Sequence, residues 1–432
     1  MGTTVSGGAT LLLAVILSIL TPAPLLAAES NPLGLEQILA VSLQNNGELV
    51  SLREEKAVRE AGKIRAGLLP NPTLDLELGS GALTGSPKES SLSIGISQEL
   101  LLAGKREKRL VVAGQEQELY RWQLADRSRL LTEELKLAFY ETLLAGQRLK
   151  LTEHSIKLSR KLFEVTKERL AAGDIPELEM NLAKVELIRS EGSRIEMERL
   201  ELQAKARLAS LMGLPSDESM EIKGTMDREP APDRNLVDLK RLAVENRPDL
   251  KGLEAEMARG ISAVALAEAE AVPNLTAGLA LRRDATSIEV GGMEGRDTAY
   301  SIGLKLVLPI PLFDRNQAGI QEARGRKNSV ESRLSAARRG LEREVATAYA
   351  SFQNAGKVLS LYKTEIIPQL EENLALTQEA YRLGEVGILS VIQEQKKYFE
   401  VSDGYLTALH ARQLALVKLE SAVATELTGG VK

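Results

Sequence analysis

The chain has no cysteine and only two histidines among its 432 residues. Without cysteine it can form neither a disulfide framework nor a metal site built on thiolates. His154 and His410 lie far apart in the sequence, so a zinc site built on several histidines is not expected either. The formal net charge is −5, whereas nucleic-acid binding calls for a basic face. We therefore expect no metal centre, no cofactor and no nucleic-acid partner.

Aromatic residues are also scarce. They make up 3% of the chain, although 44% of the residues are hydrophobic and 27% are charged. Large compact cores normally take much of their bulk from Phe, Tyr and Trp. A chain dominated instead by Ala, Leu, Glu, Lys, Arg and Gln favours long helices or coiled coils over several globular domains.

The only long apolar run lies at the N-terminus. Residues 10–20 are apolar, and Pro22, Pro24 and small residues follow them. This pattern is typical of a cleaved signal peptide, here residues 1–28. The alternative is a membrane anchor, but the run is too short to cross about 30 Å of hydrocarbon. No later run approaches about 18 apolar residues, so we expect an exported chain without a transmembrane helix.

The chain repeats its own plan. Short segments recur in the same order after an offset of about 200 residues, which indicates an internal duplication. We assign residues 29–213 to the first repeat, 214–235 to a linker rich in Pro, Asp and Glu, and 236–432 to the second repeat. The matching segments are Asn45–Leu49 with Asn246–Leu250, Leu69–Asn71 with Val272–Asn274, Ser93–Ile96 with Ser301–Leu304, and Arg169–Gly173 with Ala380–Gly384.

Each repeat begins with a helical segment, at 35–69 and at 236–271, and two alternating segments follow. Alternation of apolar and polar residues predicts strands with one apolar face. The loops that join each pair, at 80–90 and at 282–297, are rich in Gly and polar residues and predict two β-hairpins. The expected strands span about 72–82 and 90–101 in the first repeat, and about 274–283 and 298–309 in the second.

A long helix and a return helix close each repeat. In the first repeat they cover 105–172 and 177–211, and the long helix would extend about 100 Å at 1.5 Å per residue. In the second repeat they cover 316–383 and 390–427. Pro368 interrupts the second long helix and is expected to kink it.

Two apolar stripes run along the first long helix. One contains Leu135, Leu149 and Phe163, and the other contains Leu130, Leu144 and Leu158, each with a period of seven. Stripes five positions apart lie on nearly opposite sides of a helix, so this helix should pack against a neighbour on each side. We expect a layer or closed ring of helices. The alternative is an elongated antiparallel coiled coil, which explains one stripe better than two.

The number of strands limits what they can form. Four strands are too few for a membrane barrel, which needs at least about eight. Either they make a small soluble sheet that caps a coiled coil, or several chains pool their strands. Two chains would supply eight strands, whose interior fills with side chains, whereas three would supply twelve and leave a pore.

Several motifs resemble those of the TolC-like outer-membrane efflux protein family. They are Asn246–Leu250, Val272–Leu275, Leu308–Phe313 and Tyr381–Val386, in an order that covers essentially the whole mature chain. Two further segments, Gln98–Arg106 and Ala171–Leu178, resemble the branch that serves cobalt–zinc–cadmium or copper–silver resistance pumps.

The resemblance implies a mainly α fold with a membrane β-barrel. A homotrimer would form a twelve-stranded barrel in outer-membrane lipid and a long coiled-coil barrel of helices across the periplasm of a Gram-negative cell. Its partners would be a periplasmic adaptor protein and an inner-membrane pump of the resistance-nodulation-division type.

The turns between the long and return helices are the candidate functional sites. No Gly-rich phosphate loop, Ser/His/Asp cluster or paired-histidine helix is present, so we expect no enzymatic activity. Each long helix ends beside a glycine, which suits a chain reversal. The resemblance implies that these turns form the periplasmic aperture and the adaptor contact. Their residues are Arg169, Leu170, Gly173 and Asp174 in the first repeat, and Tyr381, Arg382, Gly384 and Glu385 in the second.

Charge at the aperture departs from the family pattern. Many members carry an acidic ring just after the second glycine, where this chain has Ser390 and Gln393. Glu179 is the matching position of the first repeat, and with Glu177 and Glu385 it could form an acidic mouth that selects cations. The alternative is that these carboxylates are only solvated charges.

The sequence therefore predicts a trimeric outer-membrane exit duct of a tripartite efflux system, with heavy-metal cations as the expected cargo. The alternative is a periplasmic coiled-coil adaptor or structural protein without a membrane barrel.

Overall fold

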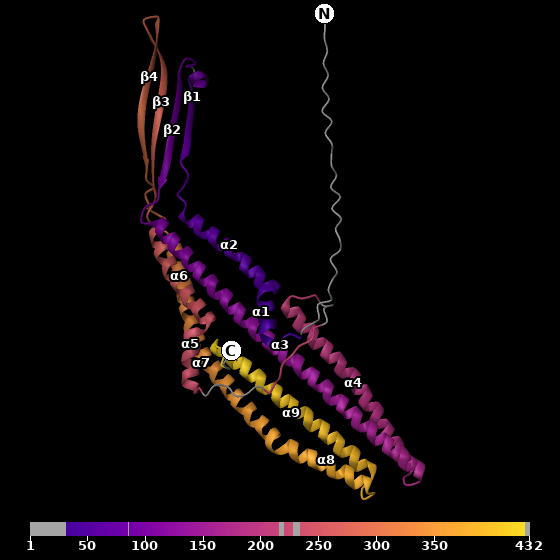
Figure 1. The fold of residues 1–432 in the computed structure, drawn as a ribbon. Helices are drawn as coiled ribbons and strands as arrows, with labels where there is room; N and C mark the ends of the chain where they lie inside the picture. Colours follow the sequence, from indigo (N-terminus) through magenta and orange to yellow (C-terminus); the bar gives the residue numbers. More distant parts are fainter. Residues whose placement is uncertain (1–31, 85, 216–219, 228–233, 428–432) are drawn as a thin grey trace, which may run out of the picture.

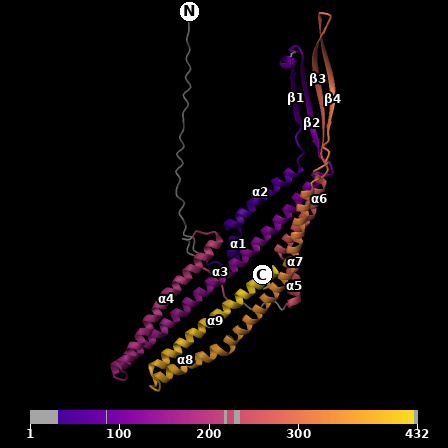
Figure 2. The same cartoon turned by 180° about the vertical axis from the view of Figure 1, so that it is seen from behind.

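The structure, a computed structural model, describes residues 32–84, 86–215, 220–227 and 234–427. A four-stranded sheet forms one end of an elongated molecule, and long helices extend from its base (Figures 1 and 2). The predicted signal peptide, residues 1–28, lies outside the described residues.

The first helical segment of each repeat is broken in two, where a single segment was expected. Asn46 separates α1 (Leu35–Asn45) from α2 (Gly47–Gly67), and Arg247 separates α5 (Leu236–Asn246) from α6 (Pro248–Glu270). Arg247 is extended because the following proline disfavours the helical conformation in the residue before it. Asn46 caps α2, since its side chain accepts a hydrogen bond from the amide of Leu49 at 3.2 Å.

The strands are β1 (Thr73–Ser80), β2 (Ser90–Leu100), β3 (Leu275–Val290) and β4 (Met293–Val307), in the order β1-β2-β3-β4. Every neighbouring pair is antiparallel, and the β2–β3 pair joins the two repeats. A short 3₁₀ turn, η1 (Gly81–Thr84), follows β1.

The loop predicted at 282–297 is wrong. β3 and β4 stay paired as far as Val290 and Met293, and only Gly291 and Gly292 form the turn. Both glycines have positive φ, +63° and +83°, as a tight two-residue hairpin turn requires. The polar residues that suggested a loop are compatible with a strand because main-chain pairing does not depend on side-chain polarity.

One face of the sheet is apolar and exposed. Leu76 of β1, Ile94 of β2, Leu281 of β3 and Ile302 of β4 stand in one cross-strand row. Their exposed fractions are 61%, 46%, 63% and 78%. The neighbouring row on the opposite face contains Gly95 and Ala280. The next row on that face consists of Glu77, Ser93, Arg282 and Ser301. The sheet therefore presents an uncovered apolar surface on one side and small, polar and charged side chains on the other.

The long helices have the predicted arrangement. α3 (Lys105–Ala172) has 68 residues, and α4 (Glu177–Met212) returns beside it. α3 packs against α4 on one side and against α9 (Ile388–Val423) on the other, as its two apolar stripes predict (Figure 1).

The kink expected at Pro368 lies just before that residue. α7 (Gln317–Leu361) and α8 (Ile367–Arg382) are joined by a five-residue π-helical segment, η2 (Tyr362–Ile366). Proline has no amide hydrogen for the carbonyl four residues earlier, which favours a local change of helical register there.

Three clusters of buried apolar side chains stabilise the helical part. The first joins α1, α3, α4 and α9 around Leu135, Phe139 and Leu208. The second joins α5, α7 and α9 around Leu239, Val345 and Leu419. The third lies at the far end of the long helices and includes Tyr381. Residues 220–227 of the linker belong to the first cluster through Met220 and Met226.

The C-caps of the two return helices provide a test of the duplicated plan. Gly213 ends α4 and Ala424 ends α9, both in the left-handed region, at φ +72° and +52°. We expect Ala424→Gly to raise the free energy of unfolding by about 0.5–1 kcal/mol, because glycine carries no penalty there. Gly213→Ala should lower it, since the new Cβ would lie 2.6 Å from the carbonyl oxygen of Asn45. Thermal unfolding followed by circular dichroism measures both; equal effects of the two substitutions would contradict this interpretation.

Candidate functional site at the tips of the helical hairpins

The two helix reversals at the far end of the molecule have the same main-chain geometry. Gly173 between α3 and α4 and Gly384 between α8 and α9 have φ of +80° and +79°. The amide of Asp174 donates to the carbonyl of Arg169, and the amide of Glu385 donates to that of Ala380, both at 2.9 Å. This is the closure typical of a helix that ends at a left-handed glycine. The matching segments of the two repeats thus build matching turns (Figures 1 and 2).

Arg169 and Tyr381 connect these two turns. The Nη1 atom of Arg169 donates to the main-chain carbonyl of Tyr381 at 3.0 Å. Its guanidinium carbon also lies 5.0 Å from the centre of the Tyr381 ring, within the range of a cation–π contact. On the other side, the Tyr381 hydroxyl donates to Oε2 of Glu179 at 3.3 Å. One aromatic side chain of α8 is therefore held between an arginine of α3 and a glutamate of α4.

The environment of Tyr381 keeps its hydroxyl protonated. The side chain is 3% exposed. Burial raises the pKa of Tyr381, and the Glu179 carboxylate raises it further, while Arg169 opposes them. The hydroxyl therefore remains a hydrogen-bond donor to Glu179 throughout the physiological pH range.

An apolar cluster supports this polar link. Leu162 of α3, Ala183 of α4 and Ile388, Val391 and Ile392 of α9 pack around Tyr381. An ion pair of 3.0 Å between Lys396 of α9 and Glu186 of α4 adds a second connection between the hairpins. These residues were not predicted from the sequence, although the apolar spacing after Gly384 is a signal that could have identified the buried face of α9.

The other predicted tip residues do not converge within one chain. Leu170 is half-buried, and Arg382 pairs with Glu379 of its own helix at 2.7 Å. The remaining side chains are exposed on the two turns: Asp174, Glu177, Glu385, Ser390 and Gln393. Of the predicted set, the structure brings together Arg169, Glu179 and Tyr381.

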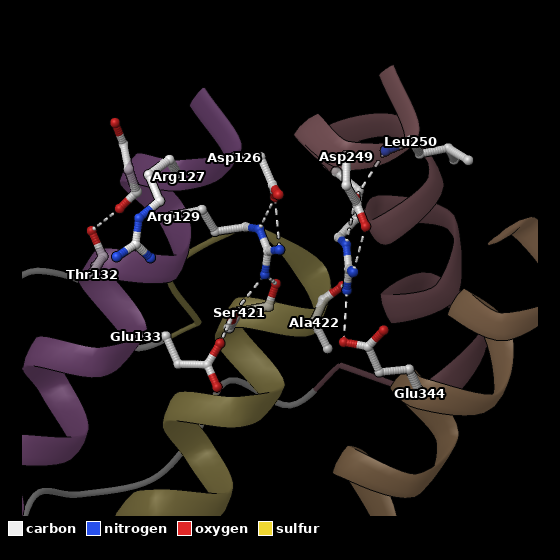
Figure 3. Close-up of polar contacts among 12 residues, drawn as sticks. Asp126, Arg127, Arg129, Thr132, Glu133, Asp249, Leu250, Glu344, Ser421 and Ala422 are labelled. Carbon is white, nitrogen blue, oxygen red and sulfur yellow. Dashed lines mark hydrogen bonds and ion pairs between the residues drawn. The ribbon is translucent and has the colours of Figure 1, made fainter. Parts of the chain in front are cut away.

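A second cluster of hydrogen-bonded polar side chains lies midway along the molecule, where the C-terminal end of α9 meets both repeats (Figure 3). Arg129 of α3 donates to Asp126 at 2.7 Å and to the carbonyl of Ser421 at 3.1 Å. The hydroxyl of Ser421 donates to Glu133 at 2.5 Å. A cation at the C-terminal end of a helix is favourable because it compensates the unpaired carbonyl groups.

Arg247 makes the matching contacts from the second repeat. Its guanidinium donates to both carboxylate oxygens of Asp249, at 2.8 and 2.7 Å. It also donates to Glu344 of α7 at 2.8 Å and to the carbonyl of Ala422 at 3.2 Å (Figure 3). The Arg247 side chain is 8% exposed, whereas those of Asp249 and Glu344 are 41% and 50% exposed, so the guanidinium is buried and its carboxylate partners reach the solvent. The segment Asn246–Leu250, noted in the sequence as a motif, is thus a structural joint between α5, α6, α7 and α9.

The two histidines, which were not expected to bind metal, lie in different helices, His154 in α3 and His410 in α9. The ring centre of His154 lies 6.3 Å from that of Tyr398 and 6.2 Å from that of Phe399. Burial lowers the pKa of His410. Within the described ranges, no group of three or more His, Cys, Asp or Glu side chains is arranged to hold a metal ion. None of the helices in those ranges is both long and apolar enough to cross a membrane.

The duplicated plan also matches a known family. The model of the family described as "Outer membrane efflux protein" matches residues 40–214 and 239–425, which correspond to the two repeats. The chain belongs to the outer membrane efflux protein family. Membership confirms the predicted outer-membrane efflux channel, with its helical part in the periplasm.

Individual relatives of this efflux protein agree with that result. It is 25% identical to the cobalt-zinc-cadmium resistance protein CzcC of Cupriavidus metallidurans over 380 residues, which cover 88% of this chain and 87% of CzcC. It is 26% identical to the outer membrane protein OprJ of Pseudomonas aeruginosa over 409 residues, 89% of this chain and 82% of OprJ. The solved structure of CusC has the same fold, with a TM-score of 0.73 and 18% identity over 90% of this chain and 91% of that one.

Proposed function

We propose that three copies of this efflux protein form an outer-membrane exit duct that passes heavy-metal cations out of the cell. The observation that carries the proposal is the sheet, because its two edge strands, β1 and β4, have no partner on their outer sides among the described residues. Unpaired strand edges are unfavourable, and closure into a barrel removes them. Three copies would pool twelve strands, enough to leave a pore.

The apolar face of the sheet supports a barrel surrounded by lipid. Its exposed rows of Leu and Ile would be costly in water and favourable against outer-membrane hydrocarbon. The opposite face, which carries Glu77, Ser93, Arg282 and Ser301 in one row, would line the pore with polar and charged side chains. This arrangement disfavours the alternative of a periplasmic coiled-coil protein, because such a protein would leave the apolar face of the sheet exposed to water.

The helical part also exposes apolar side chains along its two edges. α4 exposes an apolar seam, and α8 lies at the opposite edge of the helical layer (Figure 1). Leu376 of α8 and Leu383, directly after α8, are exposed there. In a ring of three copies, α4 of one copy would lie beside α8 of the next. The seam of α4 comprises Leu178, Val185, Ile188, Ile195 and Leu202.

A charge placed in the α4 seam tests the assembly. Ile195 is 66% exposed in the single chain, so Ile195→Glu should leave the protomer folded and reduce the trimeric fraction in detergent by about ten-fold or more, since it would bury an unpaired carboxylate. Ser193→Glu is the matched control, because it adds the same charge about 160° around the helix. Native mass measurement compares the two; equal effects would argue against this interface.

The tips would form the periplasmic aperture and the contact with a periplasmic adaptor and an inner-membrane pump. Arg169, Glu179 and Tyr381 would hold neighbouring hairpins together there. Exposed Glu177 and Glu385, repeated in each copy, would give the mouth a negative potential that favours cations.

The cargo rests on the likeness to CzcC and requires its own test. Cells that lack this protein but keep its pump and adaptor should accumulate more cobalt, zinc or cadmium, and the intact chain should restore export. Unchanged metal content in the deletion strain would refute the metal cargo and leave the duct itself in place.

A further inference from the structure

The apolar face of the sheet becomes polar towards the end that lies away from the helices (Figure 1). Directly beyond the apolar row described above, the next row on this face consists of Leu78, Leu92, Arg283 and Tyr300. The row after it consists of Ser80, Ser90, Ala285 and Thr298. Aromatic residues in membrane barrels mark the level where hydrocarbon meets water. Tyr300 is 78% exposed, so the boundary of the apolar surface falls at the row of Arg283 and Tyr300.

Two arginines lie on this face at and beyond the boundary. Arg296 of β4 stands opposite Ser287 of β3, which is four residues beyond Arg283. The two arginine positions are therefore separated by about 13 Å along the strands, at about 3.3 Å per residue. Both side chains are exposed, and Thr298 and Tyr300 of β4 lie on the same face between them.

Among the residues that the structure describes, neither arginine has an ion-pair partner. Arg282, on the opposite face, differs in this respect, since its Nε atom donates to both carboxylate oxygens of Asp284 at 2.9 Å. The row beyond Arg296 consists of Glu289 and Glu294, and Lys88 of the β1–β2 loop pairs with Glu294. The boundary of the apolar face thus carries two positive charges without a carboxylate partner.

We propose that Arg283 and Arg296 bind the phosphate headgroups of lipid in the outer leaflet around the barrel. A guanidinium group donates two parallel hydrogen bonds to a phosphate, and the hydroxyls of Thr298 and Tyr300 are further donors. With strands tilted by about 40°, the two positions would lie about 10 Å apart along the membrane normal. They would bracket a headgroup layer of about 5–8 Å. The site rests on the proposed function, because the sheet must be part of a membrane barrel.

The apolar rows favour a lipid phosphate over a free phosphate ion. Leu281 and Ile302, one row below Arg283 and Tyr300, are 63% and 78% exposed. A lipid molecule would contact these side chains with its acyl chains and the arginines with its headgroup. A free ion would meet only solvated arginines, and exposed charge pairs are weak.

Native mass measurement of the full chain in detergent, titrated with lipid A, tests this site. Lipid A is the phosphorylated glycolipid of the outer leaflet, and the comparison lipid has the same acyl chains but no phosphates. We expect the phosphorylated form to bind about 25-fold more tightly, since each arginine near an anionic headgroup contributes about five-fold. Arg283→Gln combined with Arg296→Gln should remove this preference and leave the affinity for the dephosphorylated lipid unchanged. Arg283→Lys combined with Arg296→Lys keeps the charge and should retain most of the preference.

Arg282→Gln is the matched control, because it removes the same charge from the adjacent residue on the opposite face and should leave the preference unchanged. Equal affinity of a trimer for the two lipids, an equal loss in Arg282→Gln, or displacement of lipid A by inorganic phosphate at the same concentration would overturn the lipid site. The same spectra report the number of copies. A monomer whose preference is lost only in the double glutamine variant would refute the duct and support the lipid site.

Discussion

Replacement of Arg247 by alanine is expected to lower the free energy of unfolding by about 1.5–3 kcal/mol, the usual contribution of hydrogen bonds to a charged group. The larger cost of breaking a fully buried ion pair does not apply, since the side chains of Asp249 and Glu344 are 41% and 50% exposed. Asp249 and Glu344 would lose the guanidinium that bridges them, and the carbonyl of Ala422 would lose a donor. Because α5, α6, α7 and α9 meet at this side chain, the loss should appear as a lower midpoint of thermal unfolding of the whole helical part.

Arg241→Ala supplies the matched control. Arg241 lies on α5, six residues before Arg247, and its 3.3 Å pair with Asp238 is exposed to solvent. Exposed ion pairs contribute about 0–1 kcal/mol, so this substitution should shift the unfolding midpoint little. Similar shifts in the two variants would contradict the assignment of Arg247 as the joint of the second repeat.

Acid should weaken the same joint. Burial raises the pKa of Asp249, but hydrogen bonds and charge from Arg247 outweigh burial, and the net pKa is lowered. A carboxyl group with a lowered pKa in the folded state stabilises the fold above its unfolded pKa of about 4, and that stability is lost as the pH falls through the lower folded value. Unfolding measured between pH 7 and pH 2 should show this loss in the intact chain and a smaller one in Asp249→Asn; identical pH dependence would contradict the assignment.

Replacement of Arg169 by alanine is expected to release the two tip turns from each other. The substitution removes a charged hydrogen bond, worth about 1.5–3 kcal/mol, and a cation–π contact, worth about 0.5–1 kcal/mol. Solvent at the tip reduces these values, so we expect a rise of about 10- to 100-fold in the population of separated turns. Single-channel recording in planar bilayers should register it as more frequent or larger openings.

Arg382→Ala is the control for this experiment, since it removes a neighbouring tip charge that pairs within α8. Its conductance should stay close to that of the unchanged protein. If Arg382→Ala opened the channel as much as Arg169→Ala, the effect would come from tip charge in general and the Arg169–Tyr381 link would not be the restraint.

The sequence predicted those parts of the fold that depend on local patterns. α3 has the predicted bounds, 105–172, because glycines with positive φ flank it at 104 and 173 and its apolar stripes continue between them. The duplication likewise predicted two hairpin tips with the same turn. Local patterns failed at β3 and β4, where polar residues beyond the apolar band remain paired as far as Gly291.

The contacts that define the candidate site depend on distance in space rather than in sequence. Arg169 and Tyr381 are separated by 212 positions, and no local pattern indicated that their side chains would be in contact. The contacts of Arg247 could not be predicted for the same reason, although the segment Asn246–Leu250 was recognised as a motif. Its partners Glu344 and Ala422 lie 97 and 175 positions away.

Measurement of the native mass and the ion conductance of the full chain, extracted from outer membranes in detergent, tests the central claim most directly. The account predicts a species of three copies that unfolds on heating in detergent and forms ion-conducting channels in planar bilayers. A monomer that remains soluble without detergent and conducts no ions would contradict it.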